Sequence, residues 1–118
     1  MRDDGHIILL FHLHDQFIFG ALCYGASGAI ASCANVAPRV TVDIYEKYMA
    51  GDMQGALDAQ FSLAALRIAT GMGTFPVVLK EALAMIGYDC GECVKPIQAL
   101  NAEQRVKLRQ VLCDMKLL

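Results

Sequence analysis

Two histidines and an aspartate stand almost side by side near the start of the chain. His12 and His14 alternate, so on a strand their side chains would point to the same side, and Asp15 follows directly. Imidazole and carboxylate groups at this spacing could hold a metal ion or exchange protons with a substrate. A strand that simply ends in polar residues explains the same pattern. We favour this second interpretation, because apart from Asp15 no carboxylate or third histidine lies at a suitable spacing.

Cys90 and Cys93 form the only Cys-x-x-Cys sequence among the five cysteines. A structural zinc site needs four ligands, usually from two such pairs, and the chain has no second pair. We therefore expect a loop that carries two thiols, with no metal and no cofactor. The sequence also lacks a glycine-rich phosphate loop, a Gly-x-Ser-x-Gly elbow and a His-Glu-x-x-His motif.

The elements that must position these residues follow from the apolar pattern. Residues 6–11 form a continuous apolar run of strand length, which is typical of parallel strands buried on both faces. Asp15 is expected to cap a helix over residues 16–24, and a second buried strand is expected over 29–33. A strand, a helix and a second strand in this order form a right-handed parallel unit, so 7–11 and 29–33 should pair.

Four further helices are predicted, and a proline or a capping residue marks the start of each. They are expected over 39–50 after Pro38, from Asp52 to about residue 70, from Pro76 to Gly87, and from Asn101, whose capping box includes Gln104. The helix from Asp52 is apolar around most of its circumference and should be mostly buried. The chain is thus predicted to be mostly helical, with two strands that leave unpaired edges and apolar faces.

The composition also indicates more apolar surface than a chain of this size can bury by itself. Hydrophobic residues make up 56% of the 118 residues and charged residues only 19%, compared with about 45–50% and about 25% in typical soluble domains. This excludes a disordered chain. The formal net charge of −2 gives no basic surface for nucleic acid, so no nucleic-acid partner is expected. A chain this small and apolar is expected to be an oligomer, a membrane protein or a piece of something larger.

A membrane-spanning segment must be considered because Gln16–Pro38 contains no charged residue, and about 20 apolar residues can cross a bilayer. The sequence Gly-Ala-Ser-Gly at 25–28 predicts a turn that divides this run into pieces too short to span. We therefore expect no membrane partner. The first residues carry two acids and no secretory signal pattern, so the expected location is the cytoplasm, with reduced thiols.

Residues 25–38, Gly-Ala-Ser-Gly-Ala-Ile-Ala-Ser-Cys-Ala-Asn-Val-Ala-Pro, resemble the last barrel strand of the dihydrodipicolinate synthase and N-acetylneuraminate lyase family. The resemblance runs from about residue 7 to the end. It continues through Gly51-Asp52, the sequence Gly-Thr-Phe-Pro-Val-Val-Leu-Lys-Glu-Ala-Leu at 73–83, Gly87, Lys95-Pro-Ile and Asn101-Ala-Glu-Gln104.

The resemblance implies an α/β fold, the C-terminal portion of a (β/α)8 TIM barrel followed by a three-helix C-terminal extension. Residues 1–50 would then be the last two βα units, with strands seven and eight, and residues 51–118 the extension. The six strands outside the chain would explain why only two buried strands are found in it.

The resemblance also implies class I aldolase chemistry. In this family a lysine on the sixth strand forms a Schiff base with pyruvate or another 2-oxo acid, a tyrosine on the fifth strand relays protons, and a Gly-Thr-Thr-Gly-type loop binds the carboxylate. All three precede the matched portion. None of the five lysines lies at the Schiff-base position; they are Lys47, Lys80, Lys95, Lys107 and Lys116. No catalytic residue is therefore assigned, and the isolated chain is expected to be inactive.

Four residues match family positions around the substrate, at the carboxyl ends of the strands where barrel active sites lie. Ile30 matches a residue whose backbone borders the pocket. Ser32 and Asp15 match positions that contact the substrate tail and its hydroxyls in the sialic-acid lyase branch. Leu13 stands where most members have glycine, and its side chain would crowd the pocket.

The expected partners are a 2-oxo acid in the intact family, and either a second copy of the chain or a complementing N-terminal barrel portion. Two other functions stay open from the residues alone. One is a non-catalytic helical interaction module, and the other is a small membrane-associated protein.

Overall fold

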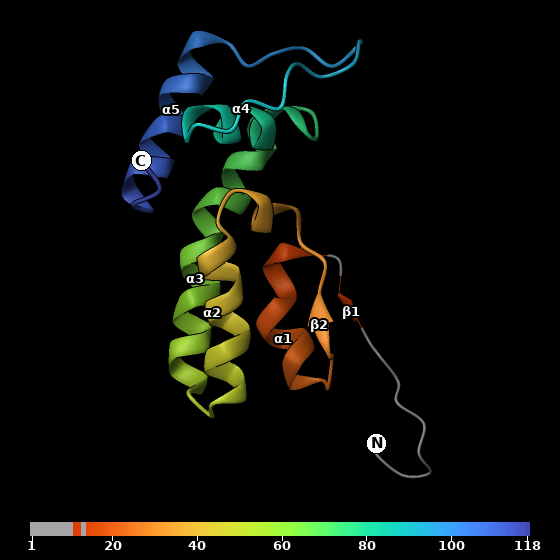
Figure 1. Ribbon diagram of the computed structural model, residues 1–118, viewed down its shortest axis with the longest axis vertical. Helices are drawn as coiled ribbons and strands as arrows, with labels where there is room; N and C mark the ends of the chain where they lie inside the picture. The colour runs from red at the N-terminus through yellow and green to blue at the C-terminus, as the bar shows by residue number, and fades with distance from the viewer. Residues whose placement is uncertain (1–10, 13) are drawn as a thin grey trace.

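The computed structural model describes residues 11–12 and 14–118, and its elements are mostly helices (Figure 1). Strands β1 (Phe11–His12) and β2 (Gly28–Ala29) pair in parallel, with Phe11 opposite Gly28 and His12 opposite Ala29. The parallel pairing of two strands around an intervening helix is therefore confirmed. Residues 6–10 of the first predicted strand lie outside the described residues.

The second strand is shorter than predicted. The expected strand over 29–33 ends at Ala29, and Ser32–Asn35 form the short 3-10 helix η2. The backbone leaves the strand direction here, and the N–H of Cys33 donates to the carboxylate of Asp15 instead of to a neighbouring strand. The apolar run that suggested a longer strand is thus partly a turn held by a buried acid.

The segment between the strands consists of the 3-10 helix η1 (Asp15–Phe17) and the helix α1 (Ile18–Cys23). The prediction that Asp15 caps this helix is wrong, because neither η1 nor α1 has a side-chain cap and the Asp15 carboxylate binds other groups. Helix α1 buries Ile18 and Leu22, and Gly25 follows it with a φ of +90°, which glycine adopts without strain. Residues 16–38 therefore do not form one continuous helix.

Helices α2 (Pro38–Met49) and α3 (Met53–Ala69) form an antiparallel pair (Figure 1). Pro38 is the first residue of α2, and the Asp52 side chain caps α3 by accepting a hydrogen bond from the N–H of Gly55 at 2.9 Å. Both starts agree with the sequence. The expectation that α3 is mostly buried is only half right, because its partners cover one side and Phe61 and Ile68 are 64% and 77% exposed.

The last helices, α4 (Val77–Met85) and α5 (Ala102–Asp114), lie beyond the short 3-10 helix η3 (Thr70–Met72), at the end of α3 away from the α2–α3 turn (Figure 1). The predicted capping box at α5 is confirmed: Asn101 accepts from the N–H of Gln104 at 2.8 Å, and Gln104 accepts from the N–H of Asn101 at 2.9 Å. Gln104 also donates to the carbonyl of Met72 at 2.7 Å, which ties α5 to η3.

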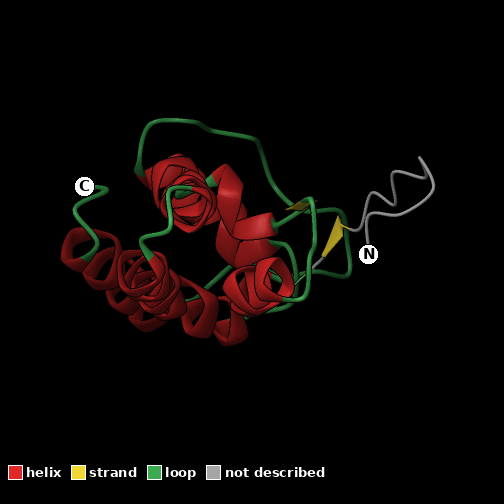
Figure 2. Cartoon of the chain, turned by 90° about the horizontal axis from the view of Figure 1, so that it is seen from below, coloured by secondary structure: helices red, strands yellow, loops and turns green. Residues whose placement is uncertain are grey.

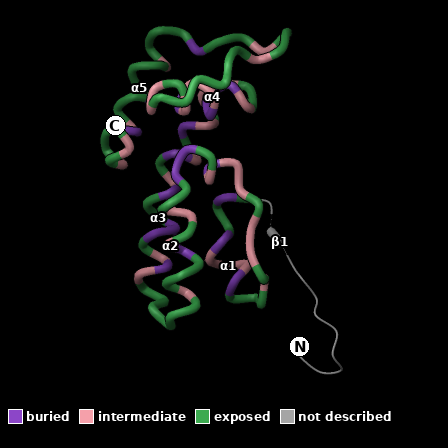
Figure 3. Tube along the Cα trace, in the orientation of Figure 1, coloured by how far each residue is buried: buried purple, intermediate pink, exposed green. Residues whose placement is uncertain are grey.

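Buried residues alternate with exposed ones along the helices (Figure 3). The fully buried, larger apolar residues are Val36, Ile44, Leu63, Leu66, Val78, Leu108 and Leu112. Seen from below, the two short strands lie at the rim of the helices rather than between them (Figure 2). The helices therefore form the core, and the strands stand at its edge.

Among the described residues, no single helix is long and apolar enough to cross a membrane. Only taken together are α3 with η3 and α4 long and apolar enough to cross a membrane, and the chain bends by 119° between them.

Candidate functional site at the ends of the strands

A buried carboxylate joins the segments that follow the two strands. Asp15 comes shortly after β1 and is only 4% exposed. One carboxylate oxygen accepts a hydrogen bond from the Ser32 hydroxyl at 2.9 Å, and the other accepts from the Cys33 N–H at 3.1 Å. Because the carboxyl ends of parallel strands lie at the same edge, this contact holds both βα segments in one place.

Gln60 of α3 completes the arrangement from the other side. Its side-chain amide donates to the Asp15 carbonyl at 2.8 Å, and its carbonyl oxygen accepts from the Phe19 N–H at 2.9 Å. The side chain is almost fully buried, at 8% exposure of the residue. Gln60 therefore holds the backbone at the first residue of η1 and in the first turn of α1. These two bonds set the direction in which the Asp15 side chain projects from the backbone.

Gln60 is the functional residue that the sequence reasoning missed. The signal was present, because it lies between Ala56 and Leu63, at helical spacing on the face of α3 that is otherwise apolar. A polar side chain on a buried face needs hydrogen-bond partners, since a buried group without them costs about 1–3 kcal/mol. A single glutamine among alanines and leucines thus predicts a buried backbone contact, although not which one.

The thiol of Cys33 is the titratable neighbour of this carboxylate. Burial raises the pKa of Cys33 to about 12, and the negative charge of Asp15 and its hydrogen bond add to that rise. The residue is fully buried as well. Cys33 therefore stays a neutral thiol at physiological pH and does not serve as a nucleophile.

A pocket of about 250 Å³ lies beside Asp15, and α3 forms most of its wall. Its lining residues are Asp15, Gln16, Gln60, Phe61, Leu63, Ala64, Arg67 and Ile68. Most of the surface of the lining is apolar, and its polar residues are Asp15, Gln16, Gln60 and Arg67. The pocket opens along the exposed side of α3, where Phe61 and Ile68 stand uncovered.

Two of the four predicted site residues are brought into contact, because Ser32 donates to Asp15. Ile30 follows β2 directly and is 64% exposed. Leu13 lies outside the described residues, so its predicted role stays a prediction. The amide of Asn35 donates to the Ser32 carbonyl at 3.0 Å, which fixes the backbone of η2 around the hydroxyl.

The histidines and cysteines that the sequence offers as possible metal ligands lie elsewhere or are only partly described. His14 is exposed, and the side chain of His12 is not described. Cys90 and Cys93 lie on the loop between α4 and α5, as expected. Within the part of the chain that the structure describes, no group of three or more His, Cys, Asp or Glu side chains could hold a metal ion.

Comparison with known proteins assigns this architecture to a family. The chain matches the Dihydrodipicolinate synthetase family over residues 3–115. The chain belongs to this family. A 4-hydroxy-tetrahydrodipicolinate synthase from Methanothrix thermoacetophila is 34% identical over 101 residues, which are 86% of this chain and 34% of that relative. The chain thus spans about a third of the length of the family member that it matches.

Two solved structures of family members superpose closely. The dihydrodipicolinate synthase of Thermotoga maritima gives a TM-score of 0.87 at 28% identity, covering 93% of this chain and 37% of that one. A prophage protein of the dihydrodipicolinic acid synthase family from E. coli K12, solved in complex with pyruvate, gives 0.85 at 26% identity and covers 93% and 38%. The family resemblance is confirmed, and the fold is that of the matching portion of these proteins.

Proposed function

We propose that this chain is the C-terminal portion of a pyruvate-dependent Schiff-base lyase or aldolase. In this proposal β1 and β2 are the seventh and eighth barrel strands, residues 1–50 are the last two βα units, and residues 51–118 are the helical extension. The family relation supports this position in the barrel. The observation that carries the proposal is the buried carboxylate of Asp15, which joins the segments after both strands through Ser32 and Cys33.

The substrate would be a 2-oxo acid such as pyruvate, which the E. coli family member binds. Asp15 is only 4% exposed and accepts hydrogen bonds from Ser32 and Cys33, so in this proposal Asp15 positions Ser32, and the Ser32 hydroxyl contacts the substrate. Its hydroxyl has one hydrogen, which goes to Asp15, and its oxygen keeps lone pairs that can accept from a substrate hydroxyl. By the family resemblance, Ile30 would border the substrate, and Leu13 would stand at the position where most members have glycine.

The reaction itself requires a part of the barrel that lies outside this chain. The family resemblance places the Schiff-base lysine on the sixth strand, and none of the five lysines here occupies that position. The 118-residue chain alone should therefore not react with pyruvate. It should contribute to activity only together with a barrel portion that carries the lysine.

The apolar surface of the chain supports a complementing partner or a second copy. Ile30, Phe61 and Ile68 are each more than 60% exposed. Exposed apolar patches larger than a few hundred Å² mark interaction sites. Burial is worth roughly 25 cal/mol per Å², so covering 400 Å² would contribute on the order of 10 kcal/mol, as much as the whole stability of a typical domain.

The decisive experiment combines the chain with the part of the Thermotoga maritima protein that it does not cover. Each sample receives pyruvate and borohydride, which reduces a Schiff base to a stable adduct, and the intact masses are measured. The chain alone should gain no adduct, and the combination should gain one adduct on the partner's lysine. The Asp15→Ala variant serves as the control, because it should combine less well. A stoichiometric adduct on a lysine of this chain would contradict the proposal.

Light scattering tests the expected assembly separately. The purified chain should self-associate, or bind the complementing barrel portion when this is added. The contrary result is a monodisperse 12.8 kDa monomer with a sharp cooperative unfolding transition. It would show that the helices alone make a self-sufficient core, which would favour a small interaction module over a barrel portion.

A further inference from the structure

The loop between α4 and α5 carries two thiols in a segment with few contacts. Residues 89–94 form neither helix, strand nor turn. Lys80 of α4 contacts the backbone of this segment. Its ammonium group donates to the carbonyl of Glu92 at 3.0 Å and to that of Cys90 at 3.4 Å. The N–H of Gly91 donates to the side chain of Asp89 at 2.8 Å. The segment is thus positioned mainly by one lysine.

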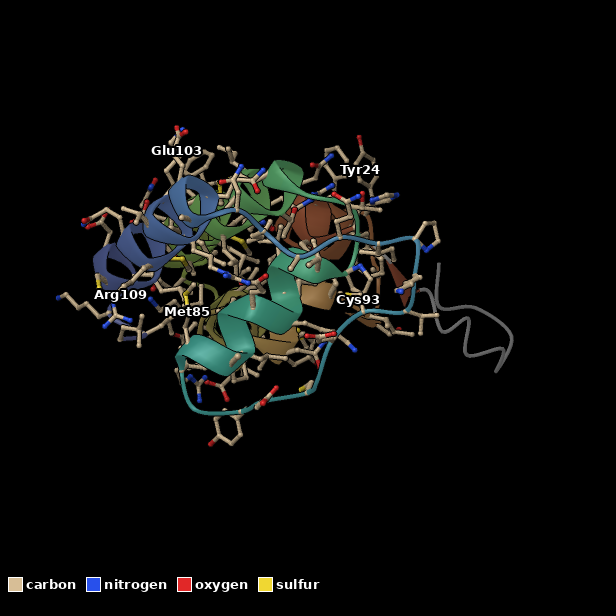
Figure 4. The ribbon with its side chains drawn as sticks, turned by 90° about the horizontal axis from the view of Figure 1, so that it is seen from above. Tyr24, Met85, Cys93, Glu103 and Arg109 are labelled. Atoms are coloured by element: carbon tan, nitrogen blue, oxygen red, sulfur yellow. The ribbon has the colours of Figure 1, made fainter. Side chains whose placement is uncertain are left out.

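The two thiols differ in their access to solvent. Cys90 is exposed, and its sulfur makes only a weak contact with the Tyr88 carbonyl at 3.6 Å. Cys93 is partly buried and lies on the loop beside α4 (Figure 4). It forms part of the wall of a pocket of about 340 Å³, together with Lys80, Glu92 and Arg105. A small reagent from solution therefore meets Cys90 first.

The backbone between the two thiols can close into a turn. A disulfide requires the two Cα atoms to be about 4.4–6.8 Å apart, whereas four residues in an extended segment span up to roughly 10 Å. A disulfide therefore requires a bent rather than an extended backbone over residues 90–93. Gly91 already has a φ of +72°, the left-handed conformation that tight turns need. Closing so short a loop costs little chain entropy.

We propose that Cys90 and Cys93 form a reversible dithiol–disulfide pair that reacts with low-molecular-weight disulfides such as oxidised glutathione. The Cys90 thiolate attacks the disulfide RSSR, forms a mixed disulfide and releases one RS⁻. The Cys93 thiolate then attacks the Cys90 sulfur, closes the Sγ–Sγ bond and releases the second RS⁻. The two cysteines lose two electrons and two protons, and RSSR is reduced to two RSH.

This site is independent of the proposed lyase function, and it changes how the loop is held. A disulfide would fix the backbone of residues 90–93, and the carbonyls of Cys90 and Glu92 that accept from Lys80 lie in this segment, so we expect the disulfide to compete with these hydrogen bonds. Lys80 therefore favours the reduced, open loop. Loss of about one hydrogen bond corresponds to about a fivefold change in an equilibrium constant.

The test equilibrates the full chain with mixtures of reduced and oxidised glutathione, quenches with an alkylating reagent and maps the peptides by mass. Wild type should lose two hydrogen atoms in the peptide that contains both thiols. The Cys93→Ser variant should accumulate glutathione on Cys90, and Cys90→Ser should acquire it much more slowly. A Cys23→Ser, Cys113→Ser double variant should behave as wild type, because these other exposed thiols take no part.

Lys80→Met, which keeps the aliphatic stem, should favour the disulfide by about fivefold. The matched control is Lys107→Met, whose ammonium pairs with exposed Glu103 on α5 and should leave the equilibrium unchanged. Three results would overturn the proposal: mixed disulfides only, disulfides only between chains, or faster glutathionylation of Cys93 than of Cys90. Equal equilibrium constants for the two lysine variants would overturn the role of Lys80.

Discussion

Replacement of Gln60 by methionine tests whether α3 holds the candidate site in place. Methionine keeps the length of the side chain and its lack of branching, but it supplies neither the donor nor the acceptor. The Asp15 carbonyl would lose its partner in a buried position, and the Phe19 N–H would lose its partner in a partly buried one. Everything else on that face of α3 can stay as it is.

The expected loss of stability follows from these two groups. A buried polar group without a partner costs about 1–3 kcal/mol, and the partly exposed N–H lies at the low end because water can reach it. Apolar burial of the methionine recovers part of this. We expect the free energy of unfolding to fall by about 2–3 kcal/mol, which at a urea dependence of about 2 kcal/mol per M shifts the midpoint by about 1–1.5 M.

The control is Gln54→Met on the same helix. Gln54 is exposed and donates only to the side chain of Asp58, so its replacement should change stability by less than about 0.5 kcal/mol. Both variants and wild type are unfolded in urea at one chain concentration, because association changes the apparent stability. Amide hydrogen exchange adds a local measurement, in which the N–H of Cys33 should exchange faster in Gln60→Met only.

Equal urea midpoints for Gln60→Met and Gln54→Met would refute this reasoning. Unchanged exchange at Cys33 in a destabilised Gln60→Met variant would refute the positioning role while leaving a purely structural one. In that case Gln60 would stabilise η1 without fixing the position of the Asp15 carboxylate.

Three further expectations can be checked with the same material. Arg105 and the Leu100 N–H hold the pKa of Glu81 below its ordinary value, so its stabilising contribution is present above about pH 4.3 and is lost as the pH falls through the lowered value. The gap in urea midpoint between wild type and Glu81→Gln should therefore be present at pH 7 and close on acidification; a gap that widens in acid would contradict the pairing. The Cys33 thiol should resist alkylation in the folded chain while Cys90 reacts, and equal rates would show that the site is open. Ser32→Ala removes one of two bonds to the carboxylate and should cost about 1 kcal/mol in urea unfolding, less than Gln60→Met.

The parts of the fold that the sequence predicted are those that depend on neighbouring residues. Pro38 begins α2, Asp52 caps α3, and Asn101 with Gln104 forms the capping box of α5. Each of these signals acts within four residues, through a fixed φ angle or a side chain that reaches the next turn. The helices could therefore be placed without knowledge of their partners.

The parts that the sequence did not predict depend on contacts between distant segments. Asp15 is of a residue type that often caps helices. Its carboxylate instead accepts hydrogen bonds from Ser32 and Cys33, 17 and 18 residues further along. The Cys33 N–H that donates to this acid lies within the range predicted as the second strand, which ends at Ala29. Gln60 reaches back 45 residues to the Asp15 carbonyl. Local propensity cannot show which of several satisfied arrangements the tertiary packing selects.

These long-range bonds also bear on how the chain is divided. The proposed boundary at residue 50 separates two barrel units from a helical extension, and the turn around Gly51 is a natural place for it. The bonds of Gln60 cross that boundary, since a residue of the proposed extension fixes the backbone that presents Asp15. Asp15 in turn fixes Ser32. The extension is therefore a supporting part of the strand-end site rather than an independent appendage, and a chain cut after residue 50 should lose the arrangement of Asp15 and Ser32 together with α3.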